Sequence, residues 1–139
     1  MNPAGRAILK PCHYHPEFES VDEEYPLHLS TGRRPLDFHT RTKTGRTKEL
    51  QEADPESYLQ LAEKNANARG IKEGDWVVVE SRRGKVELKA RVGLMVEGQV
   101  FVPFHFGYFD SQKGNARAAN ELTQGTMRTA TSLHPFSGH

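Results

Sequence analysis

The sequence predicts a mainly β domain with one or two helices, closed into a small barrel. The chain has 139 residues, which is enough for one compact domain with a buried core. Apolar and polar residues alternate from residue 76 to 92, and a dense apolar run follows at 99–104, as is typical of short strands. A clear helix start is found at Asp54. We expect a closed barrel because closure leaves no exposed sheet edge.

The chain divides into three predicted parts. Residues 1–24 carry prolines among polar and acidic residues, which predicts an extended arm or linker from a preceding domain. The barrel is expected at 25–123, with a first strand that reaches Ser30 and a turn-rich loop at 31–54. Residues 124–139 are rich in Gly, Thr and Ser and show no period. We therefore expect them to form a poorly ordered tail.

The predicted helix follows the turn-rich loop. Asp54 can act as N-cap, Pro55 suits the first helical position and Glu56 favours the positive end of the helix dipole. A basic last turn and a glycine stop lie at 69–70. We expect this helix to cover the barrel and to form no site. Its apolar face, at helical spacing, consists of Tyr58, Leu59, Ala62 and Ala66.

Residues 71–92 predict a β-hairpin, with strands at 76–80 and 85–92. The second of these strands alternates strictly between apolar and charged side chains. A further, fully buried strand is expected at 99–104, and a short helix at 115–122. The inward positions of the second hairpin strand are Val86, Leu88, Ala90 and Val92.

The candidate binding site is the loop after the first strand. Ser30, Thr31 and Gly32 end that strand, and Arg33 and Arg34 follow at once. Hydroxyls, backbone amides and guanidinium groups at a strand end suit a phosphate or pyrophosphate. Glycine there would let a bound group approach the main chain closely. A solvated basic loop is the alternative on composition alone. A second group of donors in the same loop consists of His39, Thr40, Arg41 and Thr42.

The charge distribution favours one anion-binding face. The net charge is +1, so the whole chain has no bias toward nucleic acid or membranes. Locally, an acidic segment at 17–24 precedes a basic loop at 33–48, in which Asp37 is the sole acid before Lys48. We recognise no apolar leader and no run of membrane-spanning length, and expect a soluble protein.

Other kinds of site are disfavoured. Cys12, His13 and His15 lie in the proline-flanked arm with no second ligand cluster, so we expect no metal site. The sequence shows no Ser-His-Asp or Cys-His arrangement of distinctive spacing, and we predict no catalytic residue. A single cysteine is typical of a reducing, cytoplasmic compartment. His105, between two phenylalanines, is either a functional residue or a satisfied core histidine.

Several segments, taken together and in order, resemble a known family. They look like the C-terminal dinucleotide-binding domain of molybdopterin oxidoreductases, in the branch of formate dehydrogenases and nitrate reductases. The resemblance covers 25–123; after it, relatives usually continue with Asp-Pro and Ser-Lys-x-Pro, which this chain lacks. The segments are Y-P-L-H-L-S-T-G-R (25–33), H-T-R-T-K-T-G-R (39–46), A-D-P-E (53–56), G-I-K-E-G-D-W-V-V-V-E-S-R-R-G (70–84), V-F-V-P-F-H-F-G (100–107) and A-N-E-L-T (119–123).

The resemblance implies a double-psi β-barrel that binds bis(molybdopterin guanine dinucleotide), with molybdenum or tungsten held by the full-length enzyme. It implies the remaining domains of the parent oxidoreductase as partners, and neither nucleic acid nor membrane. No turnover is expected from this chain alone, because the family's metal ligand and iron–sulfur cysteines lie in other domains. The residues implied to lie at the cofactor are Ser30, Thr31, Gly32, Arg33, His39, Thr40, Arg41, Thr42, His105, Phe106 and Asn120.

Two alternatives stay open at the level of sequence. The first is a barrel that binds RNA or another polyanion through the basic loop at 33–48. The second is a protein-interaction module that meets an acidic partner. RNA binding is disfavoured because the aromatic side chains of the loop do not interleave with its basic ones as stacking platforms would.

Overall fold

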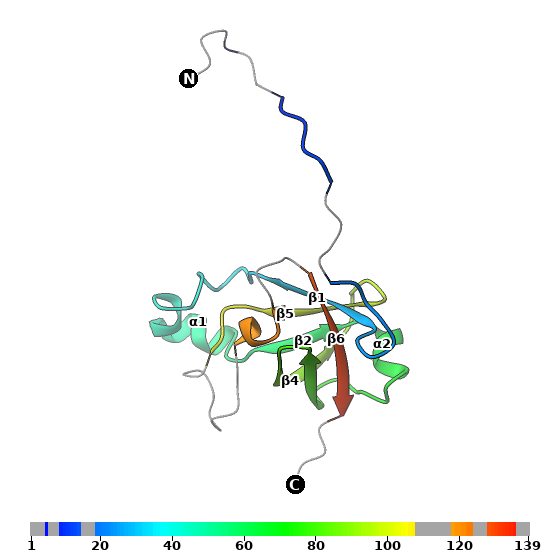
Figure 1. Cartoon of the computed structure of the whole chain (residues 1–139). Coiled ribbons are helices and arrows are strands. Elements are labelled where there is room, and N and C mark those ends of the chain that lie inside the picture. The colour runs from blue at the N-terminus through cyan, green and yellow to red at the C-terminus, as the bar shows by residue number, and fades with distance from the viewer. Residues whose placement is uncertain (1–4, 6–8, 15–18, 108–117, 124–127, 136–139) are drawn as a thin grey trace.

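The computed structural model describes residues 5, 9–14, 19–107, 118–123 and 128–135. In this part of the chain, the strands form a closed barrel in the order β1-β5-β2-β4-β3-β6 (Figure 1). The predicted mainly β barrel is confirmed. The strands are β1 (Leu27–Gly32), β2 (Tyr58–Leu61), β3 (Trp76–Ser81), β4 (Gly84–Val92), β5 (Gln99–Pro103) and β6 (Arg128–Pro135).

The barrel combines parallel and antiparallel pairs. β1 runs parallel to β5, with Gly32 opposite Pro103, and β2 runs parallel to β4, with Leu59 opposite Ala90. The β1–β6, β2–β5, β3–β4 and β3–β6 pairs are antiparallel. Two parallel pairs within a closed, otherwise antiparallel sheet agree with the double-psi barrel. Because β1 and β5 are parallel, the loops that follow them leave from the same end of the barrel.

The core is made of the side chains that the strands point into the barrel. On β3, Val77 and Val79 are fully buried, and on β4 the predicted inward residues Val86, Leu88 and Ala90 are at most 2% exposed. The alternation seen in the sequence is therefore the alternation of the barrel wall. Further core side chains come from the other strands and from the connecting turns: Leu27, Leu29, Leu59, Leu61, Ala66, Ile71, Val100, Val102, Ala119, Leu122 and Leu133.

The helix predicted from Asp54 is wrong in its position. A short helix, α1 (Lys48–Ala53), ends where it was expected to begin, and Asp54 is its C-cap. β2 occupies Tyr58–Leu61, with alternating half-buried and buried positions, and the helix α2 (Glu63–Asn67) follows it. Pairing of β2 with both β4 and β5 overrides the local helix-start signal. The C-cap of α2 is Ala68, and Gly70, the predicted stop, follows two residues later with φ +65°.

The predicted tail contains the strand that closes the barrel. We expected 124–139 to be poorly ordered, but residues 128–135 form β6, which pairs with β1 and β3. No alternation of apolar and polar residues marks this strand, because two of its buried positions, Thr131 and Ser132, are polar. Thr131 is fully buried, and its hydroxyl donates to the Glu80 carbonyl oxygen at 2.5 Å. β-Branched threonine suits a strand once its hydroxyl has a partner.

The described part of the chain also contains two 3₁₀ turns, η1 (Thr44–Arg46) and η3 (Ala119–Glu121). The helix expected at 115–122 is thus a single turn in its described part; residues 115–117 lie outside it. Residues 9–14 are exposed and lie away from the barrel (Figure 1), whereas residues 19–25 lead directly into β1. Among the described residues, no helix has the length and apolar character needed to span a membrane.

Candidate functional site

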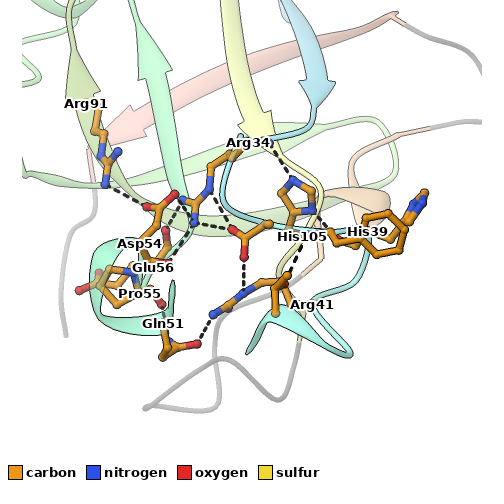
Figure 2. Close-up of polar contacts among 12 residues, drawn as sticks. Arg34, His39, Arg41, Gln51, Asp54, Pro55, Glu56, Arg91 and His105 are labelled. Atoms are coloured by element: carbon orange, nitrogen blue, oxygen red, sulfur yellow. Dashed lines mark hydrogen bonds and ion pairs between the residues drawn. The ribbon is translucent and has the colours of Figure 1, made fainter. Parts of the chain in front are cut away.

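The candidate site is the loop that leaves β1 at Gly32 and runs to α1. This loop lies against the residues that follow β5, because Gly32 and Pro103 are partners in the parallel pair. The backbone N–H of Phe104 donates to the Gly32 carbonyl oxygen at 3.3 Å. The next residue, His105, is therefore carried into the base of the loop (Figure 2).

His105 joins two points of the loop, Arg34 near its start and His39 in its middle. Its side chain is buried, at 2% exposure, and its Nε2 accepts a hydrogen bond of 2.8 Å from the backbone N–H of Arg34. Its Nδ1 contacts the carbonyl oxygen of His39 (Figure 2). A ring nitrogen that accepts from an N–H carries no proton, so Nδ1 is the protonated nitrogen and donates to His39. From sequence, His105 was either a functional residue or a satisfied core histidine. In the structure it is buried, and both of its ring nitrogens contact backbone atoms of the loop.

Asp37 joins two arginines beneath the loop surface. Its Oδ2 lies 2.8 Å from Arg34 Nη2, and its Oδ1 lies 3.0 Å from Arg41 Nε. All three side chains are at most 3% exposed. Both guanidinium groups also face the ring of Phe106, at 4.6 Å for Arg34 and 4.3 Å for Arg41. We call Arg34, Asp37 and Arg41 the loop cluster.

The loop cluster is tied to the segment between α1 and β2. The guanidinium of Arg34 donates to the carbonyl oxygens of Glu56 at 2.8 Å and Asp54 at 3.1 Å, and pairs with the Asp54 carboxylate at 2.5 Å. Arg41 donates to the side chain of Gln51 (Figure 2). Two buried cations thus have two carboxylates and several carbonyl oxygens as partners. Such complete pairing is what makes a buried charge tolerable.

The backbone of the loop is held in a strained form. His39 has φ 46° and Arg41 has φ 61°, in the left-handed region that residues with side chains seldom adopt. Each such residue costs about 1 kcal/mol or more and persists where surrounding contacts fix it. Here the fixing contacts are His105 on the His39 carbonyl and Asp37 on the Arg41 guanidinium. The turn directs the side chains of His39, Thr40 and Thr42 outward.

The predicted site residues fall into an exposed and a buried group. Thr40 and Thr42 are exposed, and their hydroxyls are 3.0 Å apart. The other exposed members of the predicted set are Arg33, His39 and Asn120. Arg41, His105 and Phe106 are instead at most 5% exposed and lie inside the loop. Asn120 belongs to η3, outside this loop.

Ser30, Thr31 and Gly32 are half-buried at the end of β1. A Cβ on Gly32 would lie 2.8 Å from Cε2 of Phe101 on the neighbouring strand. The space beside this glycine is thus taken by an aromatic ring of the barrel. Packing against Phe101 is thus one reason for a glycine here, and close approach of a bound group to its main chain stays a prediction.

Sequence reasoning missed the acids that organise the site. The predicted site residues did not include the two carboxylates that pair with the buried arginines, those of Asp37 and Asp54. They also did not include Gln51, whose amide oxygen accepts from Arg41. A signal for Asp37 was present, because a lone acid among many basic residues is a natural partner for some of them. The role of Asp54 was hidden by its suitability as a helix cap. In the arm, Cys12 is exposed, and the residues that the structure describes contain no cluster of His, Cys, Asp and Glu suited to a metal.

Comparison with known proteins identifies the family of this domain. A family model described as "Molydopterin dinucleotide binding domain" matches residues 27–136. The chain is 41% identical over 112 residues to a periplasmic nitrate reductase of Desulfovibrio desulfuricans, covering 80% of this chain and 14% of that protein. It is 40% identical over 103 residues to an F420-dependent formate dehydrogenase subunit alpha of Methanocaldococcus jannaschii, covering 73% of this chain and 15% of that protein.

A solved structure shares the fold. Acetylene hydratase from Pelobacter acetylenicus superposes with a TM-score of 0.75 and 19% sequence identity, covering 89% of this chain and 21% of that chain. The chain thus spans about a seventh of the length of the two curated relatives. The family match covers most of the chain, including β6, whose segment we had expected to be a disordered tail. This chain belongs to the molybdopterin dinucleotide-binding domain family.

Proposed function

We propose that this domain binds the guanine form of the cofactor, bis(molybdopterin guanine dinucleotide), within a molybdenum or tungsten oxidoreductase of the formate dehydrogenase or nitrate reductase type. The names of the two curated relatives support the class of enzyme. Their greater length supports partner domains that supply the metal ligand and the substrate site. When bound, the metal of the cofactor would supply the electron transfer.

The chemistry of the exposed donors fits a pyrophosphate. The one observation that carries this assignment is the internal pairing of Asp37 with both buried arginines. Because that carboxylate is used inside the loop, the outer face keeps the positive charge of Arg33. His39, Thr40 and Thr42 add polar groups on the same loop. A fixed array of a guanidinium and neutral donors matches the oxygens of a phosphate group.

The proposed roles follow from exposure. Arg33 binds the pyrophosphate, and His39, Thr40 and Thr42 bind polar edges of the cofactor. Ser30, Thr31 and Gly32 form the wall where β1 ends, and Asn120 contributes from η3. The buried residues of the predicted set hold the loop in shape and do not touch the ligand themselves: Arg41, His105 and Phe106.

The experiment measures GDP binding to the purified chain by calorimetry, because GDP carries the guanosine pyrophosphate part of the cofactor. Arg33→Ala should weaken binding about tenfold, the value of a charge-assisted hydrogen bond. Arg46→Ala, an equal charge change at an exposed position of η1, should leave binding within about twofold. Equal losses in both variants would contradict a specific site. Tighter binding of single-stranded RNA than of GDP, with a steep salt dependence, would favour the polyanion alternative.

The chain by itself is proposed to have no turnover and to act in the cytoplasm, without nucleic acid or membrane as partner. Its single cysteine supports a reducing compartment. Electron transfer from formate, or to nitrate, by the purified chain would contradict the first point. Recovery of the native protein in a periplasmic fraction would contradict the second.

A further inference from the structure

The turn between β3 and β4 holds η3, the turn that carries Asn120. Ser81, buried at 4% exposure, donates from Oγ to the carbonyl oxygen of Leu122 at 2.8 Å. Arg83 donates from Nε to the same oxygen at 2.9 Å. Two donors therefore converge on one carbonyl, which uses both of its lone pairs. Leu122 is itself fully buried, so its position in the core is fixed as well.

The two turns are also in direct backbone contact. A Cβ on Gly84 would lie 3.1 Å from the carbonyl oxygen of Glu121, which is closer than ordinary packing allows. Within the β3–β4 turn, the backbone N–H of Arg83 donates to Ser81 Oγ at 3.2 Å. The Ser81 hydroxyl thus accepts a hydrogen bond within the β3–β4 turn and donates one to the residue that follows η3. Asn120 is exposed, but buried Ala119 and Leu122 flank it.

The outer side of the same turn binds the segment that leads into the barrel. The carboxylate of Glu19 lies 2.7 Å from Arg83 Nη2 and 2.5 Å from Arg82 Nη1. Arg82 also pairs with Asp22 and lies over the ring of Tyr25, at 4.6 Å. Asp22 in turn accepts the backbone N–H of Tyr25 at 2.8 Å, which shapes the approach to β1.

Arg83 is the residue that connects these two sides. Its Nε holds the Leu122 carbonyl, while its Nη2 holds Glu19, so one rigid guanidinium plane joins the lead-in segment to η3. A lysine could satisfy one of these partners but has no fork to span both. We propose that Arg83 is a positioning residue for Asn120, and that Glu19 couples the chain before the barrel to the cofactor site. The inference rests on the proposed function through the role of Asn120.

The first test needs no ligand. Arg83→Met keeps an unbranched apolar stem and removes the guanidinium donors. Hydrogen exchange of the backbone amides of Glu121 and Leu122, which bond to the carbonyls of Ala118 and Ala119, should accelerate about tenfold. The control Lys85→Met removes an exposed cation that pairs with Glu80 at 3.0 Å, and should leave both amides unchanged. Unchanged exchange in Arg83→Met would overturn the inference.

The second test asks whether Arg83 acts through Asn120. In the wild-type background, Arg83→Met should weaken GDP binding about threefold; in an Asn120→Ala background it should have no further effect. The same loss in both backgrounds would show that Arg83 acts by general destabilisation, and would overturn the inference. If the wild-type chain does not bind GDP, the proposed function fails, and amide exchange alone decides whether Arg83 holds η3.

Discussion

The domain contains two arginine clusters of similar chemistry in opposite environments. In the loop cluster, the side chains of Arg34, Asp37 and Arg41 are 2–3% exposed. In the turn cluster, formed by Arg82, Arg83, Glu19 and Asp22, side-chain exposure ranges from 11% to 48%. In each cluster, two arginines share a carboxylate, that of Asp37 or that of Glu19. Both arginines of the loop cluster face the ring of Phe106, and Arg82 of the turn cluster lies over the ring of Tyr25. The two clusters differ in solvent exposure, and exposure decides how much each ion pair contributes to the free energy of unfolding.

Burial makes the loop cluster stiff and the turn cluster adjustable. Removing one partner of a buried pair leaves an uncompensated charge, which costs about 3–5 kcal/mol, whereas an exposed pair contributes about 0–1 kcal/mol. The strained loop, with positive φ at His39 and Arg41, needs buried ion pairs, because only these contribute enough to hold it. The contact between the barrel and the chain before it uses partly exposed ion pairs. Water competes for these charges, so the pairs are weaker and easier to rearrange.

The largest effect is expected at Asp37. Asp37→Asn keeps the shape of the side chain but removes one of the two carboxylates that serve the buried arginines. We expect the free energy of unfolding to fall by about 3–5 kcal/mol, measured by urea denaturation. Glu52→Gln is the matched control, because its ion pair with Lys48 is 3.7 Å long and mostly exposed. A similar, small loss in both variants would show that the loop cluster contributes no more than a surface pair.

An intermediate effect is expected at Gly84, where the start of β4 contacts the backbone of η3. Gly84→Ala brings a Cβ to 3.1 Å from the Glu121 carbonyl oxygen, and the backbone must shift to relieve the overlap. We expect a loss of about 1–2 kcal/mol in the free energy of unfolding. In Gly93→Ala the new methyl group meets nothing within 4 Å, so this control should be neutral or slightly stabilising. Equal stability of the two variants would show that η3 can move away from the turn.

Much of the fold could be predicted from sequence because strand periodicity is a local signal. The alternation of Val86, Leu88 and Ala90 gave β4 and its inward face directly. β2 was misread because an Asp-Pro-Glu helix start precedes it, and only pairing with β4 and β5 makes it a strand. β6 was missed because its buried Thr131 has its hydroxyl partner in Glu80, 51 residues away in sequence.

The site was predictable as a loop but not in its internal arrangement. The sequence does not distinguish Arg33 from Arg41. In the structure Arg33 is exposed, whereas Arg41 is only 5% exposed and lies under the loop. What separates them is the contact of Arg41 with Asp37 and Phe106, and Phe106 is 65 positions further along the chain. The resemblance to a family pointed to all these positions alike. The distinction between exposed residues of the loop and buried residues that hold it required the structure.

The smallest effect is expected at Glu19, and it should depend on pH. Burial by itself would raise the pKa of Glu19, but hydrogen bonds from Arg83 and Arg82, together with their charges, outweigh it and lower the pKa below the ordinary value of 4.5. The same contact raises the pKa of Arg82. A carboxylate whose pKa is lowered in the folded state stabilises the fold above its unfolded pKa, and this contribution is lost as the pH falls through the folded pKa.

The difference in unfolding free energy between wild type and Glu19→Gln should therefore be at most about 1 kcal/mol at pH 7. It should shrink as the pH falls below 4.5, and also on adding salt, since the pairs are partly exposed. Asp37→Asn, by contrast, should keep most of its cost in 1 M salt, because water and ions do not reach the loop cluster. If the two variants responded alike to salt, the contrast in solvent exposure would not be what distinguishes the clusters. Salt response is thus a sharper criterion than the size of either effect, because it separates the two environments within one experiment.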